Sequence, residues 1–323
     1  MILVIYLVFM NIAAFILYGI DKKKAEDGKY RISEASLLFF SVLGGAFGAL
    51  LGMKIFHHKT RKKKFSITVP IFAVLLCISI ILCLWQNYHI VVTEYDYTKY
   101  EAGDGLDMRI VQISDLHNQF FGFKQSILLD KIKKCEPDMI VVTGDVVDST
   151  HTVYALAEDF FEGAVKIAPV YYIKGNHEVS LEGKRLDVFI EKIKGMGVQY
   201  IDGGRAVTDK IEMIGTYDNS MNLVSGFESG DDRLKILLAH DPDYVRQYEK
   251  SGADLILAGH IHGGQIIIPG KGGLLSPNFK FFPEYYEGVH KAGDSIMIVS
   301  RGLGNSILPV RINDYPEIVV IKL

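Results

Sequence analysis

The chain has 323 residues, of which 49% are hydrophobic and 23% charged, and its formal net charge at pH 7 is −3. This balance excludes a strongly basic protein that binds nucleic acid through its surface charge, so we expect no nucleic-acid partner. The mean hydropathy is nevertheless positive, at +0.19, which indicates that apolar residues are concentrated in one part of the chain.

Three long uncharged stretches lie near the N-terminus, at residues 1–20, 35–53 and 66–85. At about 1.5 Å per residue, each is long enough as a helix to cross most or all of a hydrocarbon core of roughly 30 Å. The alternative for the first stretch is a signal peptide, but it is longer than a typical h-region and lacks a basic segment before it. The sequence therefore predicts that residues 1–85 form a multi-pass membrane domain with three transmembrane helices in the bilayer of the cell membrane.

The orientation of this domain rests on its two basic loops. Residues 21–33 contain five Lys and Arg residues and residues 54–65 contain six, so the count alone barely decides the orientation. The second loop is denser in positive charge and holds no acid, so we expect it inside the cell and the C-terminal part of the chain outside the cytoplasm. Gly44 and Gly48 have the spacing that lets a neighbouring helix approach closely, and the oligomeric state stays open.

Several short motifs of this region resemble a small bacterial integral-membrane family of unknown function, which is sometimes fused to a cold-shock domain. They are Asp21-Lys22, Arg31-Ile32-Ser33-Glu34, Gly44-Gly45-Ala46-Phe47-Gly48 and His58-Lys59-Thr60. The resemblance covers about residues 5–70 and implies no activity. We interpret His57 and His58 as part of a solvated basic loop that can contact anionic lipid head groups, rather than as metal ligands.

The pattern changes after Trp85, where residues 86–106 form a polar connector with scattered aromatic residues. Short β-branched runs then predict strands at 108–114, 138–143, 170–173, 211–214, 234–239, 255–258, 296–299 and 318–321. Helices are predicted at 124–134, 153–165, 185–195 and 244–250. The sequence therefore predicts an α/β fold for residues 107–323, a sandwich of two mixed sheets flanked by helices, preceded by the all-α transmembrane region.

Polar residues follow five of these strands directly. The five motifs are Asp115-x-His117, Gly144-Asp145-x-x-Asp148, Gly175-Asn176-His177-Glu178, His240 and Gly259-His260-x-His262. Each alone is compatible with an ordinary turn or helix cap. Together they hold five of the ten histidines in the loops where ligands of α/β folds usually bind, so we favour one common site.

These oxygen and nitrogen donors, with no thiolate among them, suit two divalent ions such as Mn, Fe or Zn. A bridging carboxylate can hold two such ions about 3.5–4 Å apart, where they share and activate a water and bind a phosphoryl oxygen. In His260-x-His262 the two imidazoles point the same way if the loop is extended, since residues two apart share a face.

In this order the five motifs resemble those of the calcineurin-like metallophosphoesterases, over roughly residues 107–323. Three further pieces, Gly263-Gly264-Gln265, Ser300-Arg301-Gly302-Leu303-Gly304 and Pro316-Glu317-Ile318, resemble more narrowly the bacterial membrane-associated branch. That branch includes phosphodiesterases and UDP-diacylglucosamine pyrophosphohydrolases. The resemblance implies a metal-dependent phosphoric ester hydrolase in which a metal-bridging hydroxide attacks the phosphorus atom in line.

The resemblance also implies a role for each motif residue. One metal would be held by Asp115, His117 and His262, and the other by Asn176, His240 and His260, with Asp145 bridging the two. His177 would donate a proton to the leaving oxygen or stabilise developing charge, and Asp148 would orient His177; a simple turn residue is the alternative for Asp148. Glu178 is expected to support the site or lie on the surface rather than act in catalysis.

The substrate is the least defined part of the prediction. Residues 266–295 are irregular and rich in aromatic residues, including Phe279, Phe281 and Phe282, and Phe120, Phe121 and Phe123 follow the first motif. An aromatic rim beside a metal site in a membrane-anchored chain favours a phosphodiester or pyrophosphate of a lipid-linked substrate, although these rings could equally only pack their loops. Two alternative functions stay open, a nuclease of the same superfamily and a non-catalytic membrane sensor.

Overall fold

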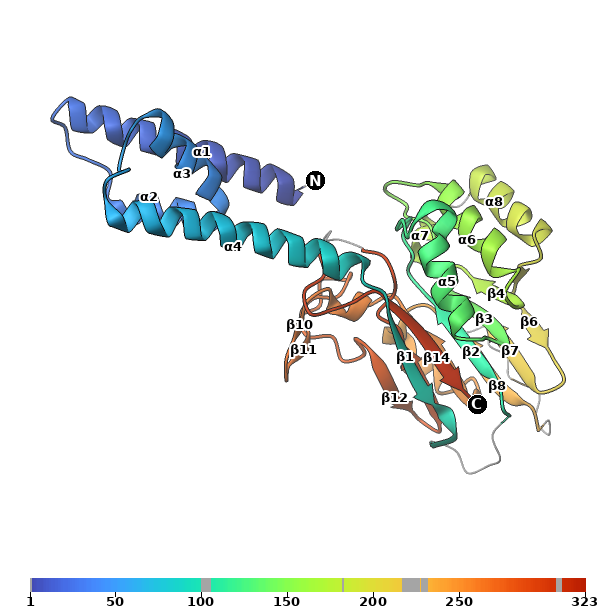
Figure 1. Cartoon of the computed structure of the whole chain (residues 1–323). Helices are drawn as coiled ribbons and strands as arrows, with labels where there is room; N and C mark the ends of the chain where they lie inside the picture. The colour runs from blue at the N-terminus through green and yellow to red at the C-terminus, as the bar shows by residue number, and fades with distance from the viewer. Residues whose placement is uncertain (1, 100–105, 182, 217–226, 228–231, 306–309) are drawn as a thin grey trace. The chain divides into compact units, whose positions relative to one another are not determined.

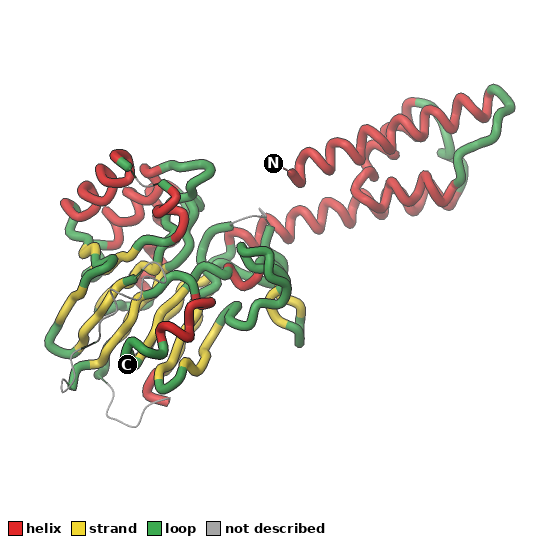
Figure 2. The backbone as a smooth tube through the Cα atoms, turned by 180° about the vertical axis from the view of Figure 1, so that it is seen from behind, coloured by secondary structure: helices red, strands yellow, loops and turns green. Residues whose placement is uncertain are grey.

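The computed structural model describes the chain except residues 1, 100–105, 182, 217–226, 228–231 and 306–309. It divides into two compact units, Met1–Leu84 and Trp85–Leu323, which are described here separately. The first unit is helical and the second is built on β-sheets (Figures 1 and 2).

The helical unit contains the three apolar segments that the sequence predicts. Its helices are α1 (Ile2–Glu26), α2 (Glu34–Phe40), α3 (Ala46–Ile55) and α4 (Lys63–Tyr88), whose last residues belong to the second unit. By length and composition, the segments Val4–Glu26, Glu34–Ile55 and Lys63–Tyr88 could each cross a membrane. The middle segment is not one straight helix, because the backbone leaves the helical region at Leu43 and at Gly44, whose φ is 102°.

Beyond this break, α3 packs along α1 and runs in the same direction (Figure 1). A Cβ atom on Gly45 would collide with the carbonyl oxygen of Met10, and one on Gly48 with that of Asn11, so both glycines are needed for the close approach. Farther along, Asp21 at the end of α1 lies 2.7 Å from His58 after α3. Later residues of α1 therefore contact later residues of α3 and of the loop after it, so the two helices run parallel.

The two basic loops consequently lie at the same end of the helical unit. Asp21 binds both Arg31 of the first loop and His58 of the second, while Glu34 at the start of α2 binds Lys62. Segment α2–α3 is therefore a helical hairpin that begins and ends at one end of the unit. A topology with three crossings would place the two loops on opposite faces of the membrane, and length and hydropathy alone do not reveal the turn that Gly44 permits.

The second unit contains two mixed sheets, as predicted, and each has six strands. The first has the order β1 (Val91–Asp96), β14 (Glu317–Lys322), β2 (Arg109–Ile113), β3 (Met139–Thr143), β4 (Val170–Ile173), β5 (Gln199–Tyr200). The second has the order β12 (Gly288–Ala292), β13 (Ser295–Val299), β9 (Leu255–Ala258), β8 (Leu234–Leu238), β7 (Ile211–Gly215), β6 (Arg205–Val207). A small hairpin pairs β10 (Ile267–Ile268) with β11 (Gly272–Gly273).

Apolar side chains on both faces of the strands form three core layers. Val141 of β3 and Leu257 of β9 belong to the core between the sheets, whereas Val142 packs under the helices on the outer face of the first sheet. These helices are α5 (Ser126–Lys134), α6 (Tyr154–Ala164) and α8 (Lys184–Gly195), which Figure 1 shows grouped together; α9 (Val245–Tyr248) packs on the second sheet. The strands are almost continuously apolar because both of their faces are buried.

The eight predicted strands and four predicted helices are all present, with ends shifted by at most two residues. Residues 86–106 differ from the expected connector, because they include β1, which pairs in parallel with β14. The exposure of β1 alternates along its length, as is typical of a strand at the edge of a sheet, and this explains its polar sequence.

Candidate metal centre

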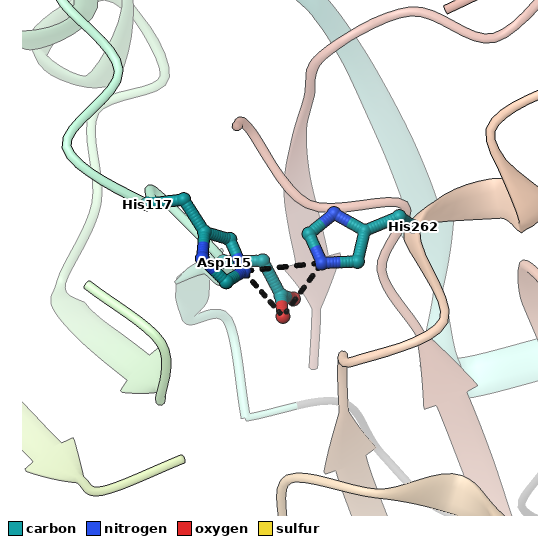
Figure 3. A group of neighbouring side chains, drawn as sticks. All are labelled: Asp115, His117 and His262. Atoms are coloured by element: carbon teal, nitrogen blue, oxygen red, sulfur yellow. Dashed lines mark hydrogen bonds and ion pairs between the residues drawn. The ribbon is translucent and has the colours of Figure 1, made fainter. Parts of the chain in front are cut away.

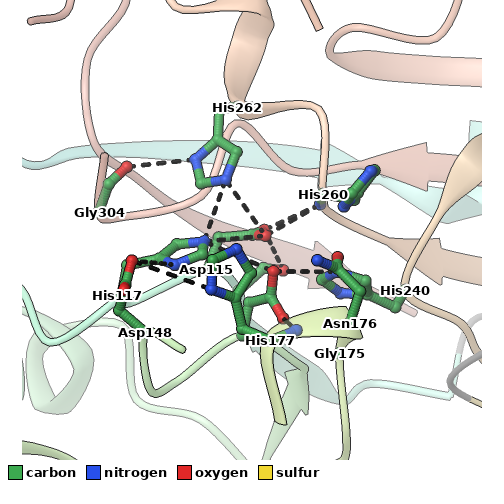
Figure 4. Close-up of polar contacts among 12 residues, drawn as sticks. Asp115, His117, Asp148, Gly175, Asn176, His177, His240, His260, His262 and Gly304 are labelled. Carbon is green, nitrogen blue, oxygen red and sulfur yellow. Dashed lines mark hydrogen bonds and ion pairs between the residues drawn. The ribbon is translucent and has the colours of Figure 1, made fainter. Parts of the chain in front are cut away.

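Five strands deliver their carboxyl ends to one region of the second unit. β2, β3 and β4 are mutually parallel, as are β8 and β9, so the loops after each set emerge at one edge of their sheet. The loops after these strands carry the motif residues, together with the short helix α7 (Asn176–Ser180). Figure 4 shows most of these residues gathered in one region.

The first group of converging donors consists of Asp115, His117 and His262 (Figure 3). The Nε2 atoms of the two histidines lie 3.1 Å apart, and the Asp115 carboxylate lies 3.9 Å from His117 and 3.6 Å from His262. Two imidazole nitrogens bound to one ion at about 2.1 Å each would lie roughly 3 Å apart. The spacing of this group therefore fits a single divalent ion.

The second group consists of Asp145, His240 and His260, with the amide of Asn176 beside them. His240 Nε2 lies 3.2 Å from the Asp145 carboxylate and 3.0 Å from the Asn176 amide oxygen. The other ring nitrogen of His240 lies 2.7 Å from the carbonyl oxygen of Thr143, which holds the ring in place.

Asp145 lies between the two groups. Its Oδ2 atom is 3.5 Å from His117 Nε2 in the first group and 3.2 Å from His240 Nε2 in the second. Its Oδ1 atom accepts a hydrogen bond from the backbone N–H of His177, which fixes the carboxylate. One carboxylate that faces both donor sets has the geometry required to bridge two ions.

The backbone of the site is unusually strained. The residues with left-handed φ angles include Asp115 (52°), His117 (44°), Asp145 (52°), His260 (70°) and His262 (52°). Each such conformation costs a non-glycine residue roughly 1 kcal/mol or more, and it persists only where the surroundings enforce it. Five of the seven expected ligands share this feature, so the loops are held in shapes that the site requires rather than in shapes that the backbone prefers.

The charges of the site are not balanced by basic side chains. Among the residues that the structure describes, no Lys or Arg forms an ion pair with Asp115, Asp145 or Asp148. Burial disfavours charge on both Asp145 and His240, yet each stabilises the charge of the other; the pKa of Asp145 is therefore held well below its usual range and the pKa of His240 is raised to about 10. Buried His260 Nδ1 has no hydrogen-bond partner among the described residues. Oxygen and nitrogen donors with unmatched negative charge fit divalent cations such as Mn, Fe or Zn.

His177 lies at the open side of the site, with its side chain 17% exposed. Its Nδ1 atom accepts a hydrogen bond of 3.0 Å from the backbone N–H of Ser149, so the neutral ring carries its proton on Nε2. Burial lowers the pKa of His177, which favours the neutral ring, and Nε2–H of that ring can donate a hydrogen bond.

Asp148 has contacts that belong to both of its expected roles. Its Oδ1 atom accepts hydrogen bonds from the backbone N–H groups of Thr150 and His151, as a turn residue does. Its Oδ2 atom lies 3.6 Å from His117 Nδ1 and 3.9 Å from His177 Nδ1. The hydrogen bond from Ser149, rather than Asp148, therefore sets the tautomer of His177. The imidazole nearest to Asp148 is that of His117.

Glu178 has a larger structural role than the sequence analysis expected. Its buried carboxylate accepts hydrogen bonds of 2.7–3.0 Å from four backbone N–H groups, which belong to Asp145, Val146, Val147 and Gly175. Two of the motif loops are thus bound together by one side chain. A Cβ atom on Gly175 would collide with the Asp145 carboxylate, so glycine is required where these loops meet.

Arg311 is a second supporting residue, which the sequence analysis did not identify. It is buried, forms an ion pair of 3.0 Å with Asp314, and donates to the carbonyl oxygen of Gly304 at 2.5 Å. The same carbonyl oxygen lies 3.2 Å from His262 Nδ1. Arg311 therefore positions the group that orients a candidate metal ligand.

The aromatic segment reaches the site. The amide nitrogen of Asn278 lies 3.4 Å from His260 Nε2, and the neighbouring Phe279 and Phe281 are 70% and 68% exposed. Phe120 and Phe123 are also exposed, but Phe121 is buried against Tyr88. Phe121 thus packs the core, whereas Phe279 and Phe281 are free to contact a ligand.

Comparison with known proteins gives two separate family matches. Residues 108–264 match the family described as calcineurin-like phosphoesterase, and residues 11–65 match a family of proteins of unknown function, DUF1294. In the second region the chain is similar to the uncharacterised protein YsdA of Bacillus subtilis, with 44% identity over 80 residues, which cover 25% of this chain and 90% of YsdA.

Longer matches connect the second unit to metallophosphoesterases. The uncharacterised metallophosphoesterase YkuE of Bacillus subtilis is 31% identical over 254 residues, which cover 74% of this chain and 87% of YkuE. The phosphodiesterase YaeI of Escherichia coli is 26% identical over 224 residues, which cover 67% of this chain and 82% of YaeI. With its fold, its motif loops and these relatives, the chain belongs to the calcineurin-like metallophosphoesterase family.

Proposed function

We propose that this chain is a membrane-anchored phosphoesterase with two metal ions, which hydrolyses a phosphodiester or pyrophosphate bond. The observation that carries the proposal is the position of Asp145 between two sets of donors, 3.5 Å from His117 and 3.2 Å from His240. A site for one structural ion would need only one of these sets, and it would need no open side.

The chain's own residues would divide the work as follows. Asp115, His117 and His262 would hold one ion, and His240, His260 and Asn176 the other, with Asp145 shared. Two divalent ions, when bound, supply an activated water and neutralise the phosphoryl oxygens. His177 would donate a hydrogen bond from Nε2–H to the leaving oxygen and stabilise the charge that develops there, and the hydrogen bond from Ser149 to Nδ1 would keep the proton on Nε2.

The second unit, Trp85–Leu323, is called the catalytic unit from here on, and its proposed location is the outer face of the membrane. The loops at residues 21–33 and 54–65 lie together and contain eleven Lys and Arg residues, five in the first and six in the second. Such an excess of positive charge favours the cytoplasmic side. Because α4 starts at this end and would cross once, the unit after it would lie outside the cytoplasm.

The proposed substrate is lipid-linked or amphiphilic. This is supported by the exposed Phe279 and Phe281, which follow a residue in contact with His260, and by the apolar helices that would anchor the chain. YaeI, a relative, is named as a phosphodiesterase, which is why we favour diesters over monoesters.

The first test is metal content measured together with hydrolysis. We expect the purified full-length chain to contain two divalent ions and to hydrolyse bis(p-nitrophenyl) phosphate faster than p-nitrophenyl phosphate. Removal of the ions by a chelator should abolish turnover, and Mn should restore it. A folded protein that binds no metal and shows no turnover after resupply would instead support a non-catalytic sensor.

The second test addresses location. In spheroplasts, external protease should digest the catalytic unit. A tag inserted in the 54–65 loop, before α4 begins, should stay protected. A catalytic unit that resists protease until the cells are lysed would contradict the proposed orientation.

A further inference from the structure

The helical unit contains an open pocket of about 560 Å³ that is separate from the metal centre. Arg31 of the first loop and residues 57–62 of the second loop line it, so it exists only because the α2–α3 hairpin returns both loops to one end. We propose that this pocket binds a phosphate-type anion, either the phosphate group of a lipid head group or free phosphate.

Positive charge exceeds negative charge around the pocket. Arg31, Lys59, Arg61 and Lys62 line it, while the carboxylates in contact with them are those of Asp21 and Glu34. Four cations against two carboxylates leave an excess of two positive charges, before any contribution from His57 and His58. This excess would attract an anion of one or two charges.

The two carboxylates hold the pocket in shape rather than filling it. Asp21 is buried, accepts hydrogen bonds from the backbone N–H of Ile32 and from Arg31, and lies 2.7 Å from His58. Lys59, whose side chain is only 3% exposed, lies 3.5 Å from Asp21 and 3.1 Å from Glu34. The charge of Lys59 is therefore balanced by these two carboxylates. Of the four cations, only the exposed Arg61 has no ion-pair partner among the described residues.

The backbone of the second loop adds further donors. His57 and Lys59 have left-handed φ angles of 47° and 61°, which are costly for non-glycine residues. In the part of the chain that the structure describes, the backbone N–H groups of Lys59, Thr60 and Arg61 donate no hydrogen bond to protein. Successive free N–H groups around a left-handed residue form the concave arrangement that binds anions in other proteins.

The chemistry of the occupant follows from these donors. Arg61 offers a planar fork of N–H groups that matches two oxygens of a phosphate, and the loop amides can bind a third oxygen. A lipid head group and a free phosphate share the tetrahedral phosphate, so the experiment must separate them.

The test uses the full-length chain in a neutral detergent with two probes. Phosphatidylglycerol binding is measured by native mass spectrometry, and inorganic phosphate binding by the ³¹P line width. Arg61→Gln removes the unpaired cation, and Lys64→Gln is the matched control, since Lys64 is exposed in the same basic run but does not line the pocket.

We expect saturable binding of one phosphate group per chain that Arg61→Gln weakens by about tenfold and Lys64→Gln by less than about twofold. Binding of phosphatidylglycerol alone assigns the pocket to a lipid head group, and binding of inorganic phosphate as well shows that the phosphate group suffices. Equal weakening by both substitutions would mean general charge attraction and would overturn the proposal, as would the absence of saturable binding of either probe. Circular dichroism of both variants checks that the helices are unchanged.

Discussion

Each unit of the chain buries a cluster of ionisable residues around one aspartate, but the two clusters are balanced differently. In the helical unit, Asp21 is surrounded by Arg31, His58 and Lys59, so the chain itself supplies the opposing charge. In the catalytic unit, Asp145 faces imidazoles, and no Lys or Arg among the described residues pairs with it.

This difference separates a structural cluster from a metal centre. A buried carboxylate is costly unless cations or hydrogen bonds compensate it. Where the chain provides basic side chains, the carboxylate can hold loops together without help. Where it provides imidazoles in place of Lys and Arg, and leaves a donor atom such as His260 Nδ1 without a hydrogen-bond partner, the set of donors fits bound cations.

The largest effect is expected from Asp145→Asn. The substitution removes the charge that both donor sets share, so bound metal and turnover should fall together, turnover by about 10³-fold or more. Metal analysis and hydrolysis of bis(p-nitrophenyl) phosphate measure both quantities. Asp209→Asn, the same change at an exposed position of the second unit, is the control and should alter neither. Full metal content with full activity in Asp145→Asn would refute the bridging role.

His177→Asn should separate catalysis from metal binding. His177 is not among the proposed ligands, and its Nε2–H is available to stabilise the leaving oxygen because Ser149 binds Nδ1, so its loss should lower turnover by about 10²–10³-fold. The two ions should remain bound, which makes metal content the internal control. Near-normal turnover of a phosphodiester by this variant would show that His177 does not stabilise the leaving oxygen.

Asp21→Asn should affect the stability of the helical unit and leave the metal centre unchanged. Arg31, His58 and the buried Lys59 would lose their common partner, which we expect to cost about 3 kcal/mol. Thermal unfolding of the full-length chain, followed by circular dichroism in detergent, measures this loss. Asp27→Asn removes only a surface ion pair with Lys29 and should change stability little. A loss of metal in Asp21→Asn comparable to that in Asp145→Asn would remove the distinction between the clusters.

The sequence predicted most of the catalytic unit because its signals are local. Strands buried on both faces appear as short apolar runs, and polar residues directly after parallel strands must meet at one edge of the sheet. For this reason the spacing in Gly259-His260-x-His262 already indicated paired donors, although the structure places both histidines in left-handed backbone rather than in an extended loop.

Other features could not be predicted because they depend on distant contacts. Glu178 looks like an ordinary acid after a motif, and only the fold brings it to the backbone of Val146 and Val147, about thirty residues away. β1 lies in a polar segment whose partner, β14, is at the other end of the second unit. The turn at Gly44 is hidden within an apolar stretch, where the glycine spacing signalled close packing but not its direction.

The smallest effect is expected from a substitution in the aromatic segment, and it tests whether these rings contact a lipid-linked substrate. Phe279→Ser should lower turnover of a phosphatidic acid esterified with p-nitrophenol by about fivefold relative to bis(p-nitrophenyl) phosphate, since only part of one ring would be buried by a lipid chain. Val188→Ser is the control, because Val188 is 68% exposed on α8 and far along the chain from the motif loops. An equal change on both substrates would mean that Phe279 only packs its loop.

A selective loss would support a lipid-linked substrate and, with it, the proposed membrane anchor, because a ring that contacts lipid is useful only if the site meets its substrate at the bilayer surface.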